Sequence, residues 1–285
     1  MARYGIPWHG SKSRIAEWVV DVLPPSHTLV DLFAGGGAVT HCALLSSKWE
    51  YIIANDMTDS MKVFCAAING EFDGYAACPA REEWFAYRDM DTAMALLHSF
   101  GNDRTTYMWS PELEAVKRPA SLMVSSPSLW ERYQWYHRFV DALVEYIKNN
   151  GDAPNRLTEC EGVERLVRLE RVTRLQGLQG LQGDYRLVDI PEGATVYADP
   201  PYRNTPNSSR YGSFDFDAFD QWLAGVDFPV FVSEFDAPAG CVEIAQTERT
   251  TTMSATTTDK RTERIFVQER FYEQCRPRTL FDLAE

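Results

Sequence analysis

The sequence lacks the patterns that mark several large classes of protein. Its six cysteines are spread over 285 residues without CxxC spacing, so neither a zinc site nor a disulfide framework is indicated. No apolar run approaches the roughly 18 residues that a membrane-spanning helix needs. The N-terminal stretch MARYGIPWHGSKSR contains no secretory hydrophobic segment. We therefore expect a soluble, cytoplasmic protein that binds neither a metal nor a membrane.

Positive charge is also scarce. The formal net charge is -13 and the isoelectric point is about 4.9. A protein that neutralises nucleic-acid phosphates needs lysine and arginine, so the total taken alone argues against a nucleic-acid partner. Charge is unevenly distributed, however, and a local basic face is expected near the C-terminus. Its cations are Lys260, Arg261, Arg264, Arg270, Arg276 and Arg278.

The stretch TLVDLFAGGGAVTHCALL, residues 28–45, predicts a strand, a glycine turn and a helix. Its three successive glycines, Gly35 to Gly37, let the backbone approach a ligand, and the N-terminus of the helix offers free amides. The turn has neither the GxGxxG nor the GxxxxGK spacing of phosphate-binding loops. A nucleotide phosphate is therefore not the expected ligand, and a tight turn without any ligand is the alternative.

A second predicted strand, WEYIIANDM, ends at Asp56, roughly 20 residues after the glycine turn. In a doubly wound α/β sheet, an acid at this position accepts hydrogen bonds from ribose hydroxyls. The turn and Asp56 together predict an adenosine-containing ligand without a required pyrophosphate, and S-adenosylmethionine fits this description. The alternative is that Asp56 only caps the next helix, which we expect at Ser60–Asn69.

The stretch PWHGSK, Pro7–Lys12, precedes the first predicted strand. It offers an aromatic face and a cation four residues apart, which suit a small ligand with a ring and a carboxylate. We predict that Lys12 pairs with the carboxylate of a methionine moiety and that Trp8 packs on the ligand or its loop. A surface turn without a ligand is an equal alternative.

The stretch VYADPPY runs from an apolar strand directly into Asp199-Pro200-Pro201-Tyr202. Two prolines end the strand and stiffen the backbone just beyond it. If the methyl acceptor is the exocyclic amine of a base, Asp199 and the Pro200 carbonyl accept its two hydrogens and aim its lone pair. Tyr202 stacks on the base once it has left the duplex, which hides the amine until then. The alternative is a merely structural strand end.

The middle of the chain differs from its two ends in amino-acid composition. Residues 70–150 are dense in aromatics and poor in apolar strands, and we interpret them as an inserted lobe. Within it, Ser128–Asn150 predicts a helix with Ser128 near its N-cap. Lys117-Arg118 is the candidate basic pair for insertion into a duplex, with a solvated turn as the favoured alternative.

Strand-rich sequence resumes after the inserted lobe. Leu-Gln-Gly occurs three times between Leu175 and Gly183, and we interpret this tract as a low-complexity connector because glycine opposes a stable helix. Further strands are predicted at Phe228–Phe235 and, as an edge hairpin arm, at Glu263–Phe271.

Four motifs occur in the order PWHGSK, DLFAGGGAVT, AND and ADPPY. This ordered set resembles the D12 class of DNA adenine methylases, the Dam-like N6-adenine methyltransferases. VFVSEFD and DKRTERIFV look like later motifs of the family, so the resemblance extends over nearly the whole chain.

The resemblance implies a Rossmann-like class I S-adenosylmethionine-dependent methyltransferase of the α/β class, with a mixed seven-stranded sheet. It assigns residues 1–71 and 156–285 to the catalytic domain and residues 72–155 to a mainly helical target-recognition insertion. It implies methyl transfer to the 6-amino group of adenine in double-stranded DNA by base flipping, with S-adenosyl-L-homocysteine as product. A restriction partner or a phage origin is compatible with it, and we expect a monomer.

The resemblance also carries residue roles onto matching positions. Asp199, Pro200, Pro201 and Tyr202 are the expected catalytic residues. The expected cofactor-binding residues are Trp8, Lys12, Asp31, Phe33, Ala34, Gly35, Asp56 and Asp199, of which Asp31 to Gly35 form the wall around the methionine part.

Several other functions stay open. Cytosine N4 methylation uses the same chemistry, although Asp199 in the first position favours adenine. Cytosine C5 methylation needs a nucleophilic cysteine after proline, and the sequence has no Pro-Cys dipeptide. A protein-glutamine methyltransferase normally begins its tetrapeptide with Asn. A small-molecule methyltransferase would not need the aromatic-rich insertion. A non-catalytic nucleic-acid-binding protein of the same fold is the alternative from another class.

Overall fold

The computed structural model describes residues 4–69, 78–158, 177–203, 214–254 and 257–275. The chain divides into two compact units. The helical unit comprises Met1–Ser11 and Lys62–Arg171, and the sheet unit comprises Lys12–Met61 and Val172–Glu285. The predicted domain boundary at 71/72 lies outside the described residues, and the boundary at 155/156 stays a prediction.

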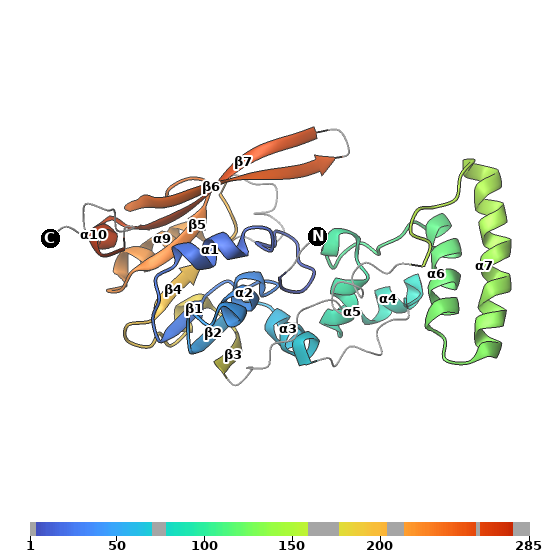
Figure 1. Ribbon diagram of the computed structural model, residues 1–285, viewed down its shortest axis with the longest axis horizontal. Coiled ribbons are helices and arrows are strands. Elements are labelled where there is room, and N and C mark those ends of the chain that lie inside the picture. Colours follow the sequence, from blue (N-terminus) through green and yellow to red (C-terminus); the bar gives the residue numbers. More distant parts are fainter. Residues whose placement is uncertain (1–3, 70–77, 159–176, 204–213, 255–256, 276–285) are drawn as a thin grey trace. The chain divides into compact units, whose positions relative to one another are not determined.

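The sheet unit contains one seven-stranded sheet with the strand order β3-β2-β1-β4-β5-β7-β6 (Figure 1). The first five strands in this order run parallel, while β7 is antiparallel to both of its neighbours. The predicted Rossmann-like fold with a mixed seven-stranded sheet is therefore confirmed. The strands are β1 Thr28–Asp31, β2 Tyr51–Asp56, β3 Leu178–Gln182, β4 Thr195–Ala198, β5 Val230–Glu234, β6 Cys241–Ser254 and β7 Thr257–Gln268.

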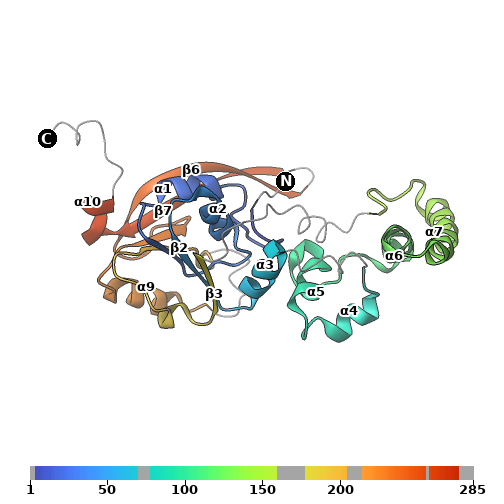
Figure 2. The same cartoon turned by 60° about the horizontal axis from the view of Figure 1, so that its bottom comes forward.

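The central strands are short and apolar because they are covered on both faces. Every residue of β1, β4 and β5 is buried, as expected for parallel strands between two layers of helices. Figure 2 shows α1 (Ala16–Val22) and α2 (Ala38–Ser46) on one face and α9 (Phe216–Gly225) on the other.

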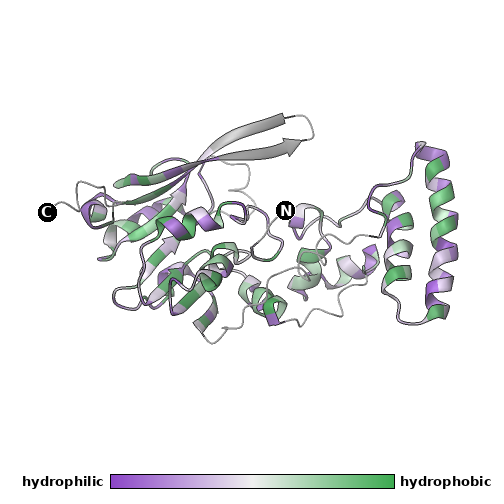
Figure 3. Cartoon of the chain, in the orientation of Figure 1, coloured by the Kyte–Doolittle hydropathy of each residue, from purple (hydrophilic) through white to green (hydrophobic). Residues whose placement is uncertain are grey.

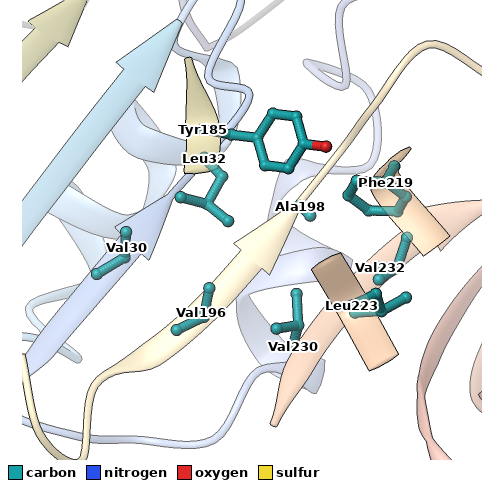
Figure 4. Close-up of a cluster of buried hydrophobic side chains, with 9 residues drawn as sticks. All are labelled: Val30, Leu32, Tyr185, Val196, Ala198, Phe219, Leu223, Val230 and Val232. Atoms are coloured by element: carbon teal, nitrogen blue, oxygen red, sulfur yellow. The ribbon is translucent and has the colours of Figure 1, made fainter. Parts of the chain in front are cut away.

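The face beneath α9 forms one continuous hydrophobic cluster (Figure 4). Strand residues such as Val30, Val196 and Val230 point into it, and Phe219 and Leu223 of α9 pack on them. Tyr185, in the 3-10 turn η3 Tyr185–Leu187, closes the cluster and lies edge-on to Trp222 with ring centroids 5.1 Å apart. This packing fixes the ends of β1 and β4 side by side.

Two predictions for the second half of the sheet unit are wrong. Part of the Leu-Gln-Gly tract is an edge strand, β3, which pairs parallel with β2 from Ile52↔Leu178 to Asp56↔Gln182. Residues 263–268 do belong to a hairpin arm, β7, but this arm lies between β5 and β6, and β6 is the edge. Neither outcome follows from local propensity, because strand pairing depends on tertiary contacts.

The helical unit contains the predicted insertion, and its described residues after α3 form helices and 3-10 turns with one isolated bridge, Ser99↔Tyr107. The helices are α3 Ser60–Asn69, which begins in the sheet unit, α4 Arg81–Tyr87, α5 Thr92–Leu97, η1 Phe100–Asn102, α6 Pro111–Ser125 and α7 Leu129–Asn150. Trp84 is the centre of its core: the indole is fully buried and donates to the Met94 carbonyl at 3.1 Å.

Helices α6 and α7, the two longest among the described residues, form a helical hairpin (Figure 1). Ser128 caps α7 as predicted, because its Oγ accepts a hydrogen bond from the Glu131 amide at 3.1 Å. The helix ends at Gly151, which has a φ of 87° that favours glycine. The predicted bounds of α7 and of α3 are therefore confirmed to within a residue.

Gln268 ties β7 to the segment between α9 and β5 and offers a test of the fold. Its buried side chain accepts from the Val230 amide at 2.9 Å and donates to the carbonyls of Leu223 and Phe228 at 3.2 and 3.3 Å. Gln268→Leu removes the side-chain partner of the Val230 amide and of the Phe228 carbonyl, and one of the two donors to the Leu223 carbonyl, and should lower the free energy of unfolding by about 3 kcal/mol. Urea denaturation measures this loss. The same change at exposed Gln246 of β6 should be nearly neutral, and equal effects would contradict the assignment.

Candidate active site

The candidate site lies where the sheet reverses its strand order. β1 and β4 are parallel neighbours, and the chain proceeds outward from them in opposite directions. In open α/β sheets, ligands bind at such a switch point, beyond the carboxyl ends of the strands. Asp31 is the last residue of β1, and Asp199 directly follows Ala198, the last residue of β4. The fold therefore brings together two acids that are 168 positions apart in the sequence.

Lys12 lies at the centre of this end of the sheet unit. Its Nζ is 2.9 Å from Asp199 Oδ1 and 3.7 Å from Glu263 Oε2, and it donates a hydrogen bond to the Tyr202 hydroxyl. The lysine side chain is 6% exposed and that of Glu263 only 2%. A buried ammonium needs such partners, because an unpaired charge in this environment is costly. We call Lys12, Asp199, Tyr202 and Glu263 the lysine cluster.

Tyr202 is held at both ends of its side chain. Its hydroxyl donates to Glu263 Oε2 at 2.7 Å, and the Lys12 ammonium lies 4.3 Å from its ring centroid. Phe235 makes an edge contact with the ring at a centroid distance of 4.5 Å. Burial raises the pKa of the Tyr202 hydroxyl well above its usual range, so the phenol stays protonated and can donate. The ring is thus fixed next to Asp199.

Burial and electrostatics oppose each other at Asp199. Burial raises the pKa of its carboxyl group above the ordinary 3.8, and Lys12 lowers it through both its charge and its hydrogen bond. Glu263 raises the pKa of Asp199 in turn. The net shift of the Asp199 pKa is upward, and without Lys12 it would be larger. Lys12 therefore favours the ionised carboxylate, which can accept hydrogen bonds.

Asp31 carries the least satisfied carboxylate of the site. Its Oδ2 accepts from Thr40 Oγ1 at 2.8 Å, whereas Oδ1 is buried and has no hydrogen-bond partner among the described residues. Burial raises the pKa of Asp31 to about 7, the bond from Thr40 opposes this, and the charges of Asp199 and Asp56 add to it. A buried acceptor without a partner calls for an explanation, and a ligand donor at this position would supply one.

The glycine turn and Asp56 meet as predicted. The Gly35 amide donates to Asp56 Oδ2 at 2.9 Å, and Asp56 Oδ1 accepts from the amide and hydroxyl of Thr58. Gly35 and Gly37 have φ values of 51° and 70°, which glycine adopts without strain. Asp56 therefore organises its own loops, and acceptance of ribose hydroxyls by the remaining lone pairs stays a prediction.

The remaining residues predicted to bind the cofactor differ in their contacts and in the unit to which they belong. The Ala34 amide donates to the Asn55 carbonyl at 2.8 Å, which ties the glycine turn to β2. Phe33 packs against Tyr185, with centroids 5.0 Å apart. Trp8 belongs to the helical unit, where the Arg104 guanidinium lies over its ring at 5.7 Å. The other seven residues predicted to bind the cofactor belong to the sheet unit.

Two buried acids of the site were missed by the sequence analysis. Glu263 lies in the noted stretch DKRTERIFV, and Glu234 lies in VFVSEFD. Glu234 accepts from the amides of Arg203 and Phe235 at 3.0 and 2.8 Å, so it fixes the chain just after Tyr202. Burial raises the pKa of Glu234 to about 7. For Glu234 the available signal was its place at the end of the otherwise apolar strand VFVSE, because acidic residues are rarely buried unless they are paired.

Only two of the six cations of the expected basic face are described, and both bind groups of the protein itself. Arg264 binds the Phe235 carbonyl and Glu243, and Arg270 binds carbonyls at the C-terminus of α9. Lys117 and Arg118 lie in α6, so the prediction of a solvated turn is wrong. The side chains of Lys260 and Arg261 and all of Arg276 and Arg278 lie outside the described residues.

The site chemistry fits S-adenosylmethionine. This ligand carries an ammonium group and a sulfonium, and the switch point holds Asp31 with an unpartnered oxygen and a raised pKa. A cationic donor beside Asp31 would satisfy that oxygen and stabilise its ionised form. Gly35 and Gly37 have left-handed backbone conformations and carry no side chains, and Gly35 lies next to Asp56. The backbone of the turn is therefore open to a ligand.

Comparison with known families supports S-adenosylmethionine as the methyl donor. The model of the D12 class N6 adenine-specific DNA methyltransferases matches residues 8–88. The predicted resemblance to this family is thereby confirmed. The matched segment contains the predicted cofactor residues from Trp8 to Asp56, whereas Asp199 to Tyr202 lie beyond it. A methyltransferase that uses S-adenosylmethionine is the function that this family implies.

Two solved structures are similar to the chain at low levels. One is a proposed RNA methyltransferase of Pyrococcus horikoshii, with 11% identity, a TM-score of 0.35 and coverage of 91% of this chain and 84% of that one. The other is the rRNA methyltransferase AviRa of Streptomyces viridochromogenes, with 14% identity, a TM-score of 0.34 and coverage of 93% and 86%. No curated protein matches the chain. The fold assignment therefore rests on the strand order.

Among the residues that the structure describes, no group of three or more His, Cys, Asp or Glu side chains is arranged to hold a metal ion. No helix among the same residues combines the length and the apolar character that crossing a membrane requires.

Asp31→Asn tests whether ionisation of the buried Asp31 destabilises the folded protein. The folded pKa of Asp31 is raised, so its ionisation opposes folding, and this cost grows as the pH rises from about 4 to about 7. The variant should therefore be more stable than the wild type by a few kcal/mol at about pH 8, and by less at about pH 5. Thermal melts without ligand at both pH values check this. A stability difference that does not depend on pH would contradict the explanation.

Proposed function

We propose that this protein transfers a methyl group from S-adenosylmethionine to the 6-amino group of adenine at specific sites in double-stranded DNA. The observation that carries the proposal is the position of Asp199-Pro200-Pro201-Tyr202. This tetrapeptide begins at the carboxyl end of β4, at the switch point of a sheet whose N-terminal segment matches the D12 methyltransferase model. Methyl transfer itself is implied by that family; the acceptor, the base and the duplex are parts of the proposal.

The chemical task is to make a poor nucleophile attack. The lone pair of an aromatic amine is delocalised into the ring, and two hydrogen-bond acceptors localise it by holding both hydrogens. The Asp199 carboxylate and the Pro200 carbonyl are preorganised for this, because the prolines stiffen the backbone and Lys12 fixes Asp199 Oδ1 at 2.9 Å. S-adenosylmethionine supplies an electrophilic methyl group on a sulfonium.

The lysine cluster gives Tyr202 a defined orientation before any base arrives. The hydroxyl is anchored to Glu263 at 2.7 Å and to Lys12, and Phe235 supports the ring. A flipped adenine that stacks on this ring would keep its amine near Asp199. Stacking of this kind contributes about 1–3 kcal/mol per base. Extrusion of the base is part of the proposal because a duplex hides the amine.

We assign residues 72–155 to target recognition and 1–71 with 156–285 to catalysis. The helical unit has its own aromatic core around Trp84 and contains the whole of the proposed insertion. Action on DNA would place the protein in the cytoplasm of a bacterial cell or of a phage-infected host.

Methylation-sensitive long-read sequencing tests the proposal directly. DNA from cells that express the protein should carry 6-methyladenine at one recurring sequence, and cells expressing Asp199→Ala should lack it. A signal on cytosine N4 at a recurring sequence would instead establish the closest alternative. No modified base, combined with DNA binding in vitro, would favour a non-catalytic binding protein.

Asp199→Ala should lower methyl transfer to DNA by about a hundredfold or more, because one preorganised acceptor is lost. Incorporation of tritiated methyl groups into unmethylated DNA measures the rate, and circular dichroism checks the fold. The matched control is Asp189→Ala, which removes an exposed acid ten positions upstream and should keep normal turnover. Near-normal turnover of Asp199→Ala would overturn the catalytic assignment.

Tyr202 can be divided into its ring and its hydroxyl by two substitutions. Tyr202→Ala should cost about 1–3 kcal/mol in kcat/KM through lost stacking. Tyr202→Phe keeps the ring and removes only the bridge between Lys12 and Glu263, so its loss should be smaller. Equal losses in both variants would mean that the hydroxyl, and not stacking, is what catalysis requires.

A further inference from the structure

Helix α7 has apolar residues on two opposite sides. One side, the inner face, consists of Trp135, Phe139, Ala142 and Tyr146, and it faces α6: the Arg118 guanidinium of α6 lies 5.9 Å from the Trp135 ring. The other side, which we call the outer seam, consists of Trp130, Tyr133, His137, Val140, Val144 and Ile147. At 3.6 residues per turn, the outer seam lies on the opposite side of the helix from the inner face.

The outer seam is exposed although it is largely apolar. Trp130 is 66% exposed, Tyr133 55%, Val144 48% and Ile147 37%, and none of the residues of α7 is fully buried. The rings of Trp130 and Tyr133 stack with centroids 5.8 Å apart, and Tyr133 meets His137 edge-on at 4.4 Å. Apolar colour accordingly recurs along α7 in Figure 3. Patches of this kind on soluble proteins mark interaction surfaces.

The spacing of the outer seam identifies the kind of partner. Its residues follow one another at intervals of three, four, three, four and three positions. This is the a and d pattern of a helix that packs along another helix. A helix with apolar residues on both sides is normally buried between two neighbours, and among the described helices and strands α6 is the one that packs extensively on α7.

The charges of α7 argue against a nucleic acid as the occupant. The helix carries Glu131, Asp141 and Glu145 against Arg132, Arg138 and Lys148, so it has no net charge. Phosphate binding requires an excess of cations. A partner with the same pattern of apolar and charged residues is a better match, and a second copy of α7 has that pattern.

In place of the monomer expected from the sequence, we propose that the outer seam of α7 is a homodimer interface in which the α7 helices of two copies pack antiparallel. A two-fold axis near the middle of the seam sets the aromatic half, with Trp130 and Tyr133, against the aliphatic half, with Val144 and Ile147. Large residues then face small ones at every position, which a parallel pair does not achieve.

The charge distribution along α7 favours the same orientation. The N-terminal half has two cations and one anion, and the C-terminal half has two anions and one cation, so antiparallel helices place halves of opposite net charge together. Antiparallel helix dipoles add to this preference. The exposed apolar side chains of the helix offer on the order of 500 Å² per copy, more than half of the roughly 800 Å² that each partner of a stable complex contributes.

Sedimentation equilibrium of the full chain tests the interface. Wild-type protein should shift from monomer to dimer within a range of about 1 to 100 μM. Val144→Glu buries a charge in the interface and should raise the dissociation constant at least about tenfold. Asn149→Glu adds the same charge at an exposed position outside the seam and should have no effect. Val144→Ala provides a milder variant in case Val144→Glu perturbs the helix, and circular dichroism verifies the fold.

A double-mutant cycle tests the orientation. In an antiparallel pair Trp130 packs on Ile147 of the other copy, so the combined Trp130→Ala and Ile147→Ala variant should weaken the dimer by less than the product of the two single effects. Independent single effects would exclude the antiparallel arrangement. A chain that stays monomeric at every concentration would overturn the proposal. So would a Val144→Glu variant that loses DNA binding while its association state is unchanged, because the seam would then contact nucleic acid.

Discussion

The Lys12 ammonium lies 2.9 Å from Asp199 and 3.7 Å from Glu263, and it opposes the rise in the pKa of Asp199 that burial causes. Because the Tyr202 hydroxyl binds both Lys12 and Glu263, the cation also sets the position of that ring. A lysine near the N-terminus thus connects the end of β4 with β7. The sheet order brings these strands within reach of one another, and the charge holds the side chains in one arrangement.

Negative charge still predominates at this end of the sheet. Asp31 and Glu234 both have pKa values raised to about 7 by burial, and the charge of Asp199 contributes to each. An excess of buried carboxylates attracts cations. The acidic residues at this end of the sheet therefore favour a cationic ligand, which the net charge of the chain does not show. S-adenosyl-L-homocysteine lacks the sulfonium charge, so such a site would hold the methyl donor more strongly than the product. The same property opposes the approach of DNA phosphates to the site itself.

Local sequence predicted the parts of the site that depend on short-range geometry. The glycine turn, the strand-ending Asp56 and the proline-stiffened Asp199 each follow from neighbours in the sequence, and the sheet places Asp31 and Asp199 on adjacent strands as the fold class requires. Glu263 could not be assigned in this way. Its role arises because β7 inserts between β5 and β6, and no local pattern shows that its side chain reaches Tyr202.

The Leu-Gln-Gly tract shows how a repeat that fits no regular period can still form a strand. Side chains alternate along a strand, so leucines three positions apart, such as Leu178 and Leu181, point to opposite faces. An edge strand of a sheet with helices on both sides can bury both, and each is half-buried.

Glycine is needed at 177, where an added Cβ would lie 2.4 Å from the Glu50 carbonyl oxygen. At the other end, the Gly183 carbonyl accepts from Asn55 at 3.0 Å, which joins the tract to the strand that ends in Asp56. The tract therefore supports the strand that carries Asp56, and close backbone packing at one end explains its Gly177.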